Sequence, residues 1–386
     1  MVYEAKFEVE AITPIFMRGA DQSQAEIRAS SIKGLMRWWF RALAHGVLLG
    51  NLTEHEAIEK IKFEENRIFG STRERSKFNL HVETNQDSLR PEKAPRSYFS
   101  FGIKGHGLIG TFNVNLEIFN NKYKDIILAT FLTFGTFGSI GQRSRRSFGS
   151  IVIKNTNKKE IKSKLPFKYT PEELSALLKW STSIFEKYFG VKLNENPKSI
   201  PVFPAIHPKF FRIKISDKGY DNWESAVISL SKTLRTFRED RKNRHSRVIK
   251  GKIISYYVTK QYNEVKKAIS NDVNVSNDVN VSLPYSAFGL PHQYNFFSMN
   301  IKGLVIEGMK NSRRASSLVF KIIKTSEHQY VPIIMFFNYV FLPNREKLQI
   351  RLKREIKAKD IQQPPLDVVI NFFECFNGKE IVWRVI

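Results

Sequence analysis

The chain has 386 residues, a length that favours two domains or three short ones. Its hydrophobic fraction of 42% and its 31 phenylalanines predict an aromatic-rich folded core and exclude disorder as the overall class. The 62 lysines and arginines outnumber the 37 acidic residues, so the formal net charge is +25. A surplus of this size makes nucleic acid the leading partner.

Two further features restrict the class of protein. Cys375 is the single cysteine, which excludes an internal disulfide or a zinc site built from several thiolates and favours a reduced, cytoplasmic setting. The most apolar run, residues 331–343, is too short to span a bilayer, and the N-terminus has the pattern of neither a signal nor a transit peptide. We therefore expect no membrane partner.

The first part of the chain has the element order of a ferredoxin-like domain. Tyr3, Ala5, Phe7 and Val9 alternate with polar residues, as in a half-buried strand. A helix should follow, with Ser30 or Ser31 as its N-cap. The expected elements in chain order are a strand at 3–11, a helix at 31–45, strands at 78–83 and 111–119, a helix at 123–137 and a strand at 150–154. This order predicts a domain over residues 1–155 with a glycine-rich loop at 138–150.

The same order recurs in the second part of the chain. After a linker at 156–200, which holds a helix at 171–189, we expect a second domain over 201–386. Its predicted elements are a strand at 210–215, a helix at 223–237, strands at 317–324 and 331–341, a helix at 365–376 and a strand at 380–386. The predicted fold class is α+β, with tandem ferredoxin-like βαββαβ domains. An insertion at 238–310 contains a tandem hexapeptide at 270–281, and we expect part of it to be mobile.

The first basic motif lies on the helix expected at 31–45. Lys33, Arg37 and Arg41 are four residues apart, so they share one face, and no acidic residue lies on this stripe. The free N–H groups at the helix start, near Ser31, suit a phosphate. The alternative is an ordinary amphipathic helix with a solvated basic face.

The second basic motif is the glycine-rich loop. Gly141 lets the backbone approach a ligand and present its N–H groups as an anion nest. Arg143, Arg145 and Arg146 supply guanidinium groups for phosphates, and Phe148 could stack on a base. A helix cap followed by a basic turn is the alternative, but a cap does not require three arginines in four residues. A third block, residues 235–252, is weaker evidence because such charge runs are often solvated tracts.

No motif indicates a cofactor, a metal or catalysis. The eight histidines are scattered, no P-loop is present, and no paired carboxylates or nucleophile elbow stand out. We therefore expect neither a metal site nor a cofactor.

The motifs together resemble a known family. Residues 12–21, 26–43, 67–71, 287–291 and 313–317 resemble RAMP proteins of the type III-B (Cmr) CRISPR effector complex, and more narrowly its first-named subunits. Ser147 and Ser317 depart from the glycine and proline expected at their positions. The resemblance implies RRM-related ferredoxin-like domains in an antiviral ribonucleoprotein. It also implies contacts with guide RNA (crRNA) and single-stranded target RNA near the guide 3′ end, and with backbone, small and palm-domain subunits.

Three hypotheses follow from the sequence. The favoured one is a non-catalytic RNA-binding subunit, in which Arg18, Arg28 and the pair Arg313 and Arg314 support the two basic motifs. The second is a RAMP endoribonuclease that uses Asp21, since related RAMP nucleases use a loop aspartate. The third is a structural scaffold whose basic surface meets acidic partner subunits.

Overall fold

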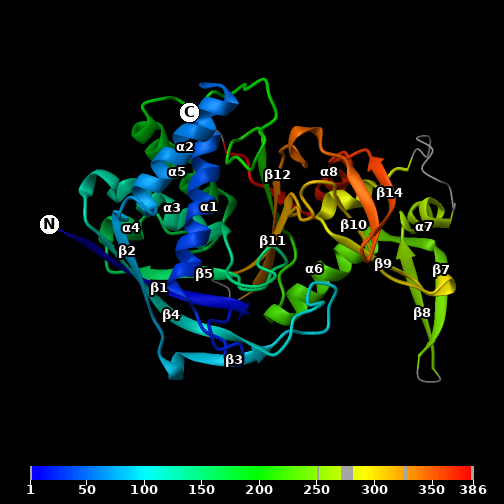
Figure 1. Cartoon of the computed structure of the whole chain (residues 1–386). Helices are drawn as coiled ribbons and strands as arrows, with labels where there is room; N and C mark the ends of the chain where they lie inside the picture. The colour runs from blue at the N-terminus through cyan, green and yellow to red at the C-terminus, as the bar shows by residue number, and fades with distance from the viewer. Residues whose placement is uncertain (1, 250–251, 271–280, 326–328, 384–386) are drawn as a thin grey trace. The chain divides into compact units, whose positions relative to one another are not determined.

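The computed structural model describes residues 2–249, 252–270, 281–325 and 329–383 (Figure 1). The chain divides into two compact units. The first unit comprises Met1–Ser231, Val319–Tyr339 and Phe376–Ile386, and the second comprises Lys232–Leu318 and Val340–Cys375. These limits differ from the predicted domain boundaries at residues 155 and 201, which stay a prediction.

The first unit contains a sheet in which β1 (Tyr3–Ile15) lies between β4 (His106–Ile118) and β5 (Ile151–Thr156). The strand order is β2-β4-β1-β5, where β2 is Phe78–Glu83, and β3 (Leu89–Lys93) also pairs with β4. Each pairing is antiparallel. The alternation predicted for β1 is confirmed, because Ala5, Phe7 and Val9 are buried while the intervening residues are exposed.

Helices α1 (Ala29–Leu48), α3 (Lys124–Phe137) and α5 (Pro171–Phe189) pack against one another above this sheet in the view of Figure 1. α5 has the bounds expected from the sequence, and Thr170 and Glu173 form a capping box at its start. α2 (Glu54–Phe69) was not predicted as a whole helix and packs against α1. A short helix, α4 (Lys159–Lys162), follows β5.

A second sheet in the first unit has the order β11-β12-β6-β15. Its strands are β6 (Phe211–Ser216), β11 (Leu318–Lys324), β12 (Tyr330–Phe337) and β15 (Gly378–Glu380). The predicted strands and the helices α6 (Trp223–Arg238) and α8 (Asp367–Glu374) are confirmed within a few residues, except that β15 begins earlier and is shorter than the predicted 380–386. Residues 384–386 lie outside the described residues.

Aromatic rings join the helices to this second sheet. Trp38 of α1 lies 5.4 Å from Phe337 between ring centroids, and Phe337 lies 4.5 Å from Phe211 on the neighbouring strand. Phe137 at the end of α3 also contacts Phe211, at 6.2 Å between ring centroids. The aromatic-rich composition therefore forms the interior between the helices and the second sheet.

The second unit holds most of the predicted insertion. β7 (Glu239–Ile249) and β8 (Lys252–Thr259) form a hairpin that is followed by α7 (Tyr262–Ser270). A four-stranded sheet has the order β14-β13-β10-β9, with β9 at His292–Phe296, β10 at Ile301–Gly308, β13 at Leu348–Leu352 and β14 at Glu355–Ile361. Residues 271–280, with most of the tandem hexapeptide, lie outside the described residues. The expected mobility of the insertion stays a prediction.

Candidate nucleic-acid interface

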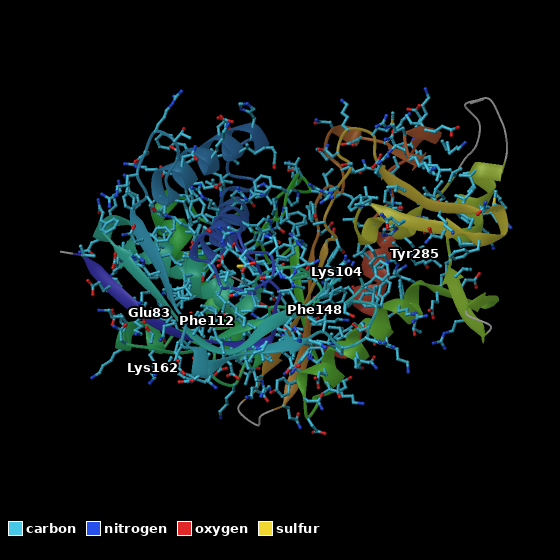
Figure 2. All side chains as sticks on the ribbon, turned by 60° about the horizontal axis from the view of Figure 1, so that its bottom comes forward. Glu83, Lys104, Phe112, Phe148, Lys162 and Tyr285 are labelled. Carbon is cyan, nitrogen blue, oxygen red and sulfur yellow. The ribbon has the colours of Figure 1, made fainter. Side chains whose placement is uncertain are left out.

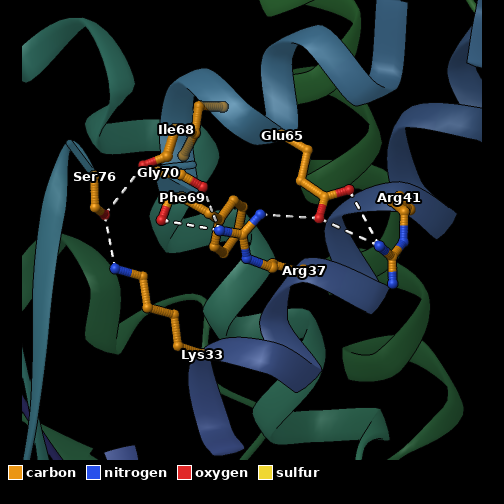
Figure 3. Close-up of polar contacts among 8 residues, drawn as sticks. All are labelled: Lys33, Arg37, Arg41, Glu65, Ile68, Phe69, Gly70 and Ser76. Carbon is orange, nitrogen blue, oxygen red and sulfur yellow. Dashed lines mark hydrogen bonds and ion pairs between the residues drawn. The ribbon is translucent and has the colours of Figure 1, made fainter. Parts of the chain in front are cut away.

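The basic stripe on α1 is held by neighbouring elements (Figure 3). Glu65 of α2 accepts hydrogen bonds from Arg37 Nη1 at 3.1 Å and from Arg41 Nη1 at 3.2 Å. Arg37 Nη2 also donates to the backbone carbonyls of Phe69 and Gly70 at the end of α2. No acidic residue lies on the stripe itself, but α2 supplies Glu65 as an acidic partner that the sequence analysis did not identify.

Lys33 at the start of the stripe is also engaged. Its Nζ donates to Ser76 Oγ at 2.8 Å and lies 4.6 Å from the ring centroid of Phe78. Burial lowers the pKa of the Lys33 amine, and the charge of Arg37 lowers it further. Arg41 is more exposed than Arg37, with 43% of its side chain accessible against 28% for Arg37.

The start of α1 differs from the prediction. Arg28, not Ser30 or Ser31, is the N-cap residue, and its side chain makes no capping hydrogen bond. The N–H of Ser31 donates to the Arg28 carbonyl at 3.1 Å, so this donor is already used within the turn. The Arg28 side chain is exposed and pairs with Glu26 at 3.1 Å. A phosphate at this helix start stays a prediction that rests on Arg28 more than on Ser31.

The glycine-rich loop between α3 and β5 is fixed against β1. Gly141 has φ +86°, and a Cβ there would lie 2.7 Å from the Phe16 carbonyl oxygen. Gly149 has φ +63°, and its N–H donates to the Pro14 carbonyl at 2.9 Å. The N–H groups of Ile140, Gln142, Ser147 and Ser150 also donate to protein oxygens. These N–H groups are used within the protein and the glycines serve close packing of this backbone, so the anion nest at Gly141 stays a prediction.

The three loop arginines have different positions. Arg143 is exposed, and its Nη2 donates to the Phe101 carbonyl. The Arg145 guanidinium lies 5.1 Å from the ring centroid of Trp38. The Arg146 guanidinium lies beside two rings that contact each other, 5.5 Å from Phe99 and 5.4 Å from Phe320. Arg143 is thus the most accessible of the three for a phosphate.

Phe148 cannot be the base-stacking residue in this structure. Its side chain is completely buried, and its ring packs edge-on against Phe16 at 5.6 Å. The prediction for Phe148 is corrected because residues 147–153 form a continuous buried run, and this side chain belongs to the core.

A second loop, residues 94–105, lies beside the glycine-rich loop and was missed by sequence reasoning. We call it the aromatic loop. Arg143 donates to its Phe101 carbonyl, and Arg18 Nη2 donates to its Lys104 carbonyl at 2.9 Å. Phe99 anchors the loop in the core against Phe320, at 5.0 Å between centroids. The run from Arg96 to Lys104 mixes basic and aromatic residues without an acidic one, a signal typical of RNA contact.

Lys321 on β11 was also missed. Its side chain is completely buried, and its Nζ donates to the carbonyls of Gly135 at 3.1 Å and Gly138 at 2.6 Å. These carbonyls lie at the end of α3, where the glycine-rich loop begins. Burial holds the pKa of the Lys321 amine well below its usual range.

The candidate catalytic residue Asp21 is an exposed loop residue. Its carboxylate accepts hydrogen bonds from Ser23 N at 2.8 Å and Ser23 Oγ at 2.6 Å, and these bonds lower its pKa. This is an Asx turn, in which the carboxylate stabilises its own loop. Among the described residues, no group of three or more His, Cys, Asp or Glu side chains could hold a metal ion.

Arg313 and Arg314 belong to the second unit. Arg313 is exposed, whereas Arg314 Nη2 donates to the Val340 carbonyl at 3.0 Å and its backbone pairs with Leu290. The pair therefore belongs to a different unit from the glycine-rich and aromatic loops. Within the described part of the chain, no helix is long and apolar enough to cross a membrane.

Comparison with known proteins agrees with the predicted resemblance. Residues 8–152 match the family model of the RAMP superfamily. The chain is 26% identical to CRISPR system Cmr subunit Cmr1-1 of Pyrococcus furiosus over 356 residues, which cover 88% of both chains. It is 51% identical over 82 residues to Cmr subunit Cmr1-2 of the same organism, a match that spans 21% of this chain and 41% of that relative.

A solved structure shows the fold. The chain resembles the crystal structure of Cmr1 from Pyrococcus furiosus in its apo form, with a TM-score of 0.58, 20% identity and full coverage of both chains. The resemblance to RAMP proteins and to the first-named Cmr subunits is confirmed, as is the mixed α and β class.

Proposed function

We propose that the chain is a non-catalytic RNA-binding subunit of a type III-B CRISPR effector complex. It contacts guide RNA or single-stranded target RNA near the guide 3′ end, beside backbone, small and palm-domain subunits. The observation that carries the proposal is the similarity to Cmr subunit Cmr1-1 over 88% of both chains. The net charge of +25 supports an RNA partner.

The RNA-binding surface that we propose is centred on the glycine-rich and aromatic loops. Arg18 and Arg143 reach the aromatic loop from two different segments, and that loop exposes Arg96 and Lys104. Four cations close together suit the phosphates of a single strand. Contacts of this kind predict little sequence preference and an affinity that falls with salt.

We also propose that the chain has a tandem ferredoxin-like fold. In both sheets of the first unit, the first strand of the βαββαβ series lies between the third and fourth, with the second strand at an edge. This repeated order, β2-β4-β1-β5 and β11-β12-β6-β15, supports two related βαββαβ halves.

Single-stranded RNA binding across a salt series tests the proposal. Arg143→Glu should weaken binding at least tenfold at low salt and reduce the slope of log affinity against log salt by about 0.7, the value of one phosphate contact on a single strand. Lys162→Glu is the matched control, because it makes the same charge change at an exposed position of α4 that is well separated from Lys104 in Figure 2. Equal losses in both variants would show that only the net charge matters.

The same samples distinguish the two alternatives. RNA that is cut by the wild type and left whole by Asp21→Ala would establish the endoribonuclease. No binding even at low salt, with tight binding to an acidic partner subunit, would establish the scaffold. The Asx turn favours a structural role for Asp21, since both carboxylate bonds are made to Ser23 in the same loop.

A further inference from the structure

We propose that the Phe101 ring is a stacking platform for one base of a single-stranded RNA. This inference rests on the proposed function and deepens it, because it adds a base contact to a surface otherwise made of cations. Phe101 is 77% exposed, the highest exposure of any large hydrophobic side chain among the described residues. A phenyl ring that is this exposed to water suits a ligand with a flat face of its own.

The aromatic loop holds this ring on a preformed turn. Ser97 N donates to Ser100 Oγ at 2.9 Å, and Ser100 N donates to Ser97 Oγ at 3.2 Å, so the two serines close the turn before Phe101. The Ile103 N–H donates to the Ser100 carbonyl at 3.0 Å, which closes a turn that contains Phe101. A prearranged ring loses little conformational entropy when a base stacks on it.

Two residues fix this turn to the body of the first unit. Phe99, two residues before the exposed ring, is 1% exposed and packs on Phe320. The Arg146 guanidinium packs beside both rings, 5.5 Å from Phe99 and 5.4 Å from Phe320. Arg146, which the sequence predicted to bind phosphate, therefore supports the loop that presents Phe101. Arg143 also holds this loop, because it donates to the Phe101 carbonyl.

The charges around the ring favour RNA over a protein partner. Residues 94–105 contain Arg96 and Lys104, both exposed, and no Asp or Glu. Arg143 and Arg18 add two further cations at the loop backbone. The phosphates on either side of a stacked base would contact these cations. A protein-docking surface would need a broader apolar area than Phe101 and the partly exposed Tyr98 provide.

The test compares an intact RNA oligonucleotide with an abasic one of the same length, which keeps the phosphates and lacks the bases. Phe101→Ala should weaken binding of the intact oligonucleotide about 5- to 100-fold, the loss typical of one stacked base. It should leave binding of the abasic oligonucleotide unchanged within twofold, with the same salt slope. Phe101→Trp should restore binding, since a larger ring stacks equally well.

Phe63→Ala is the matched control, because Phe63 is 63% exposed on α2, outside the aromatic loop, and its removal should change neither affinity. Wild-type binding of both oligonucleotides by Phe101→Ala would overturn the stacking inference and leave the proposed function intact. If Phe101→Ala lost affinity equally for both oligonucleotides, the stacking inference would be overturned, and the loss would be assigned to a deformed loop. Normal RNA binding with failure to join the effector complex would assign Phe101 to a protein interface. Absence of RNA binding by the wild type would overturn the proposed function together with this inference.

Discussion

Replacing Lys321 by methionine should make the stability of the first unit less dependent on pH. Lys321 is completely buried, and its amine donates to the carbonyls of Gly135 and Gly138. Burial is the one cause that lowers its pKa, and no carboxylate among the described residues offsets it. Methionine keeps the length of the side chain and removes the amine, so the variant isolates the titration of this group.

The sign of the effect follows from proton uptake. In the unfolded chain the amine has a pKa of about 10.4, so between the lower folded pKa and pH 10.4 the unfolded state binds one more proton. The unfolding free energy of the wild type therefore rises with pH in this window, by about 1.4 kcal/mol per pH unit from this one group. The group contributes its full stabilisation above pH 10.4, and that contribution is lost as pH falls toward the folded pKa.

The two hydrogen bonds of the Lys321 amine determine the stability difference between the wild type and the variant at high pH. At about pH 10.4 the Lys321→Met variant lacks two bonds worth roughly 1 kcal/mol each, so it should be about 2 kcal/mol less stable than the wild type. Below that pH the wild type loses stability and the variant does not, so the stability difference between the two proteins should shrink as the pH falls.

Urea unfolding followed by tryptophan fluorescence measures this difference. All five tryptophans, at positions 38, 39, 180, 223 and 383, belong to the first unit, so the signal reports that unit. Lys162→Met is the control, because it makes the same chemical change at an exposed position and should show no pH-dependent difference. A constant difference between pH 7 and pH 10.5 for Lys321→Met would refute the reasoning. It would mean that the carbonyls at the end of α3 stabilise the ammonium form enough to keep its usual pKa.

Two further predictions concern the basic motifs. Arg37→Ala should lower the unfolding free energy by about 2 kcal/mol in the same urea assay, because three hydrogen bonds to Glu65, Phe69 and Gly70 are lost. A loss of RNA affinity with unchanged stability would instead support RNA contact by the α1 stripe. Ser147→Gly should raise the stability by about 1 kcal/mol, because Ser147 has φ +69° and a buried hydroxyl without a hydrogen-bond partner among the described residues. A lower melting temperature of Ser147→Gly by scanning fluorimetry would contradict this.

The fold was largely predictable because local patterns determine its elements. The alternation in β1, the apolar run of α3 and the capping box of α5 each identify an element without information from distant residues. α2 was overlooked, although Thr53 and Glu56 form a capping box that marks its start. The boundaries of the compact units were not predictable, because β11 and β12 return to the first unit after a long excursion through the second.

The candidate site was less predictable because its contacts join residues far apart in the chain. Glu65 meets Arg37 and Arg41 across 28 and 24 positions, and Lys321 reaches Gly138 across 183. A count of charges along a helix face cannot show such partners. Phe148 illustrates the same difficulty, since the sequence identifies an aromatic residue beside arginines and only the packing against Phe16 shows that it is buried.

The three arginines of the glycine-rich loop have different roles, since two of them pack on aromatic rings and the third is exposed. Arg146 packs beside Phe99 and Phe320, and Arg145 lies over Trp38, so reversing either charge would disturb packing as well as any RNA contact. Arg143 is exposed, yet it also holds the carbonyl of Phe101. Its charge and the position of the aromatic ring are therefore coupled, and Arg143→Glu alone cannot separate phosphate binding from loop geometry. Phe101→Ala can, because it removes a ring that nothing in the described fold uses for packing and leaves every cation of the two loops in place.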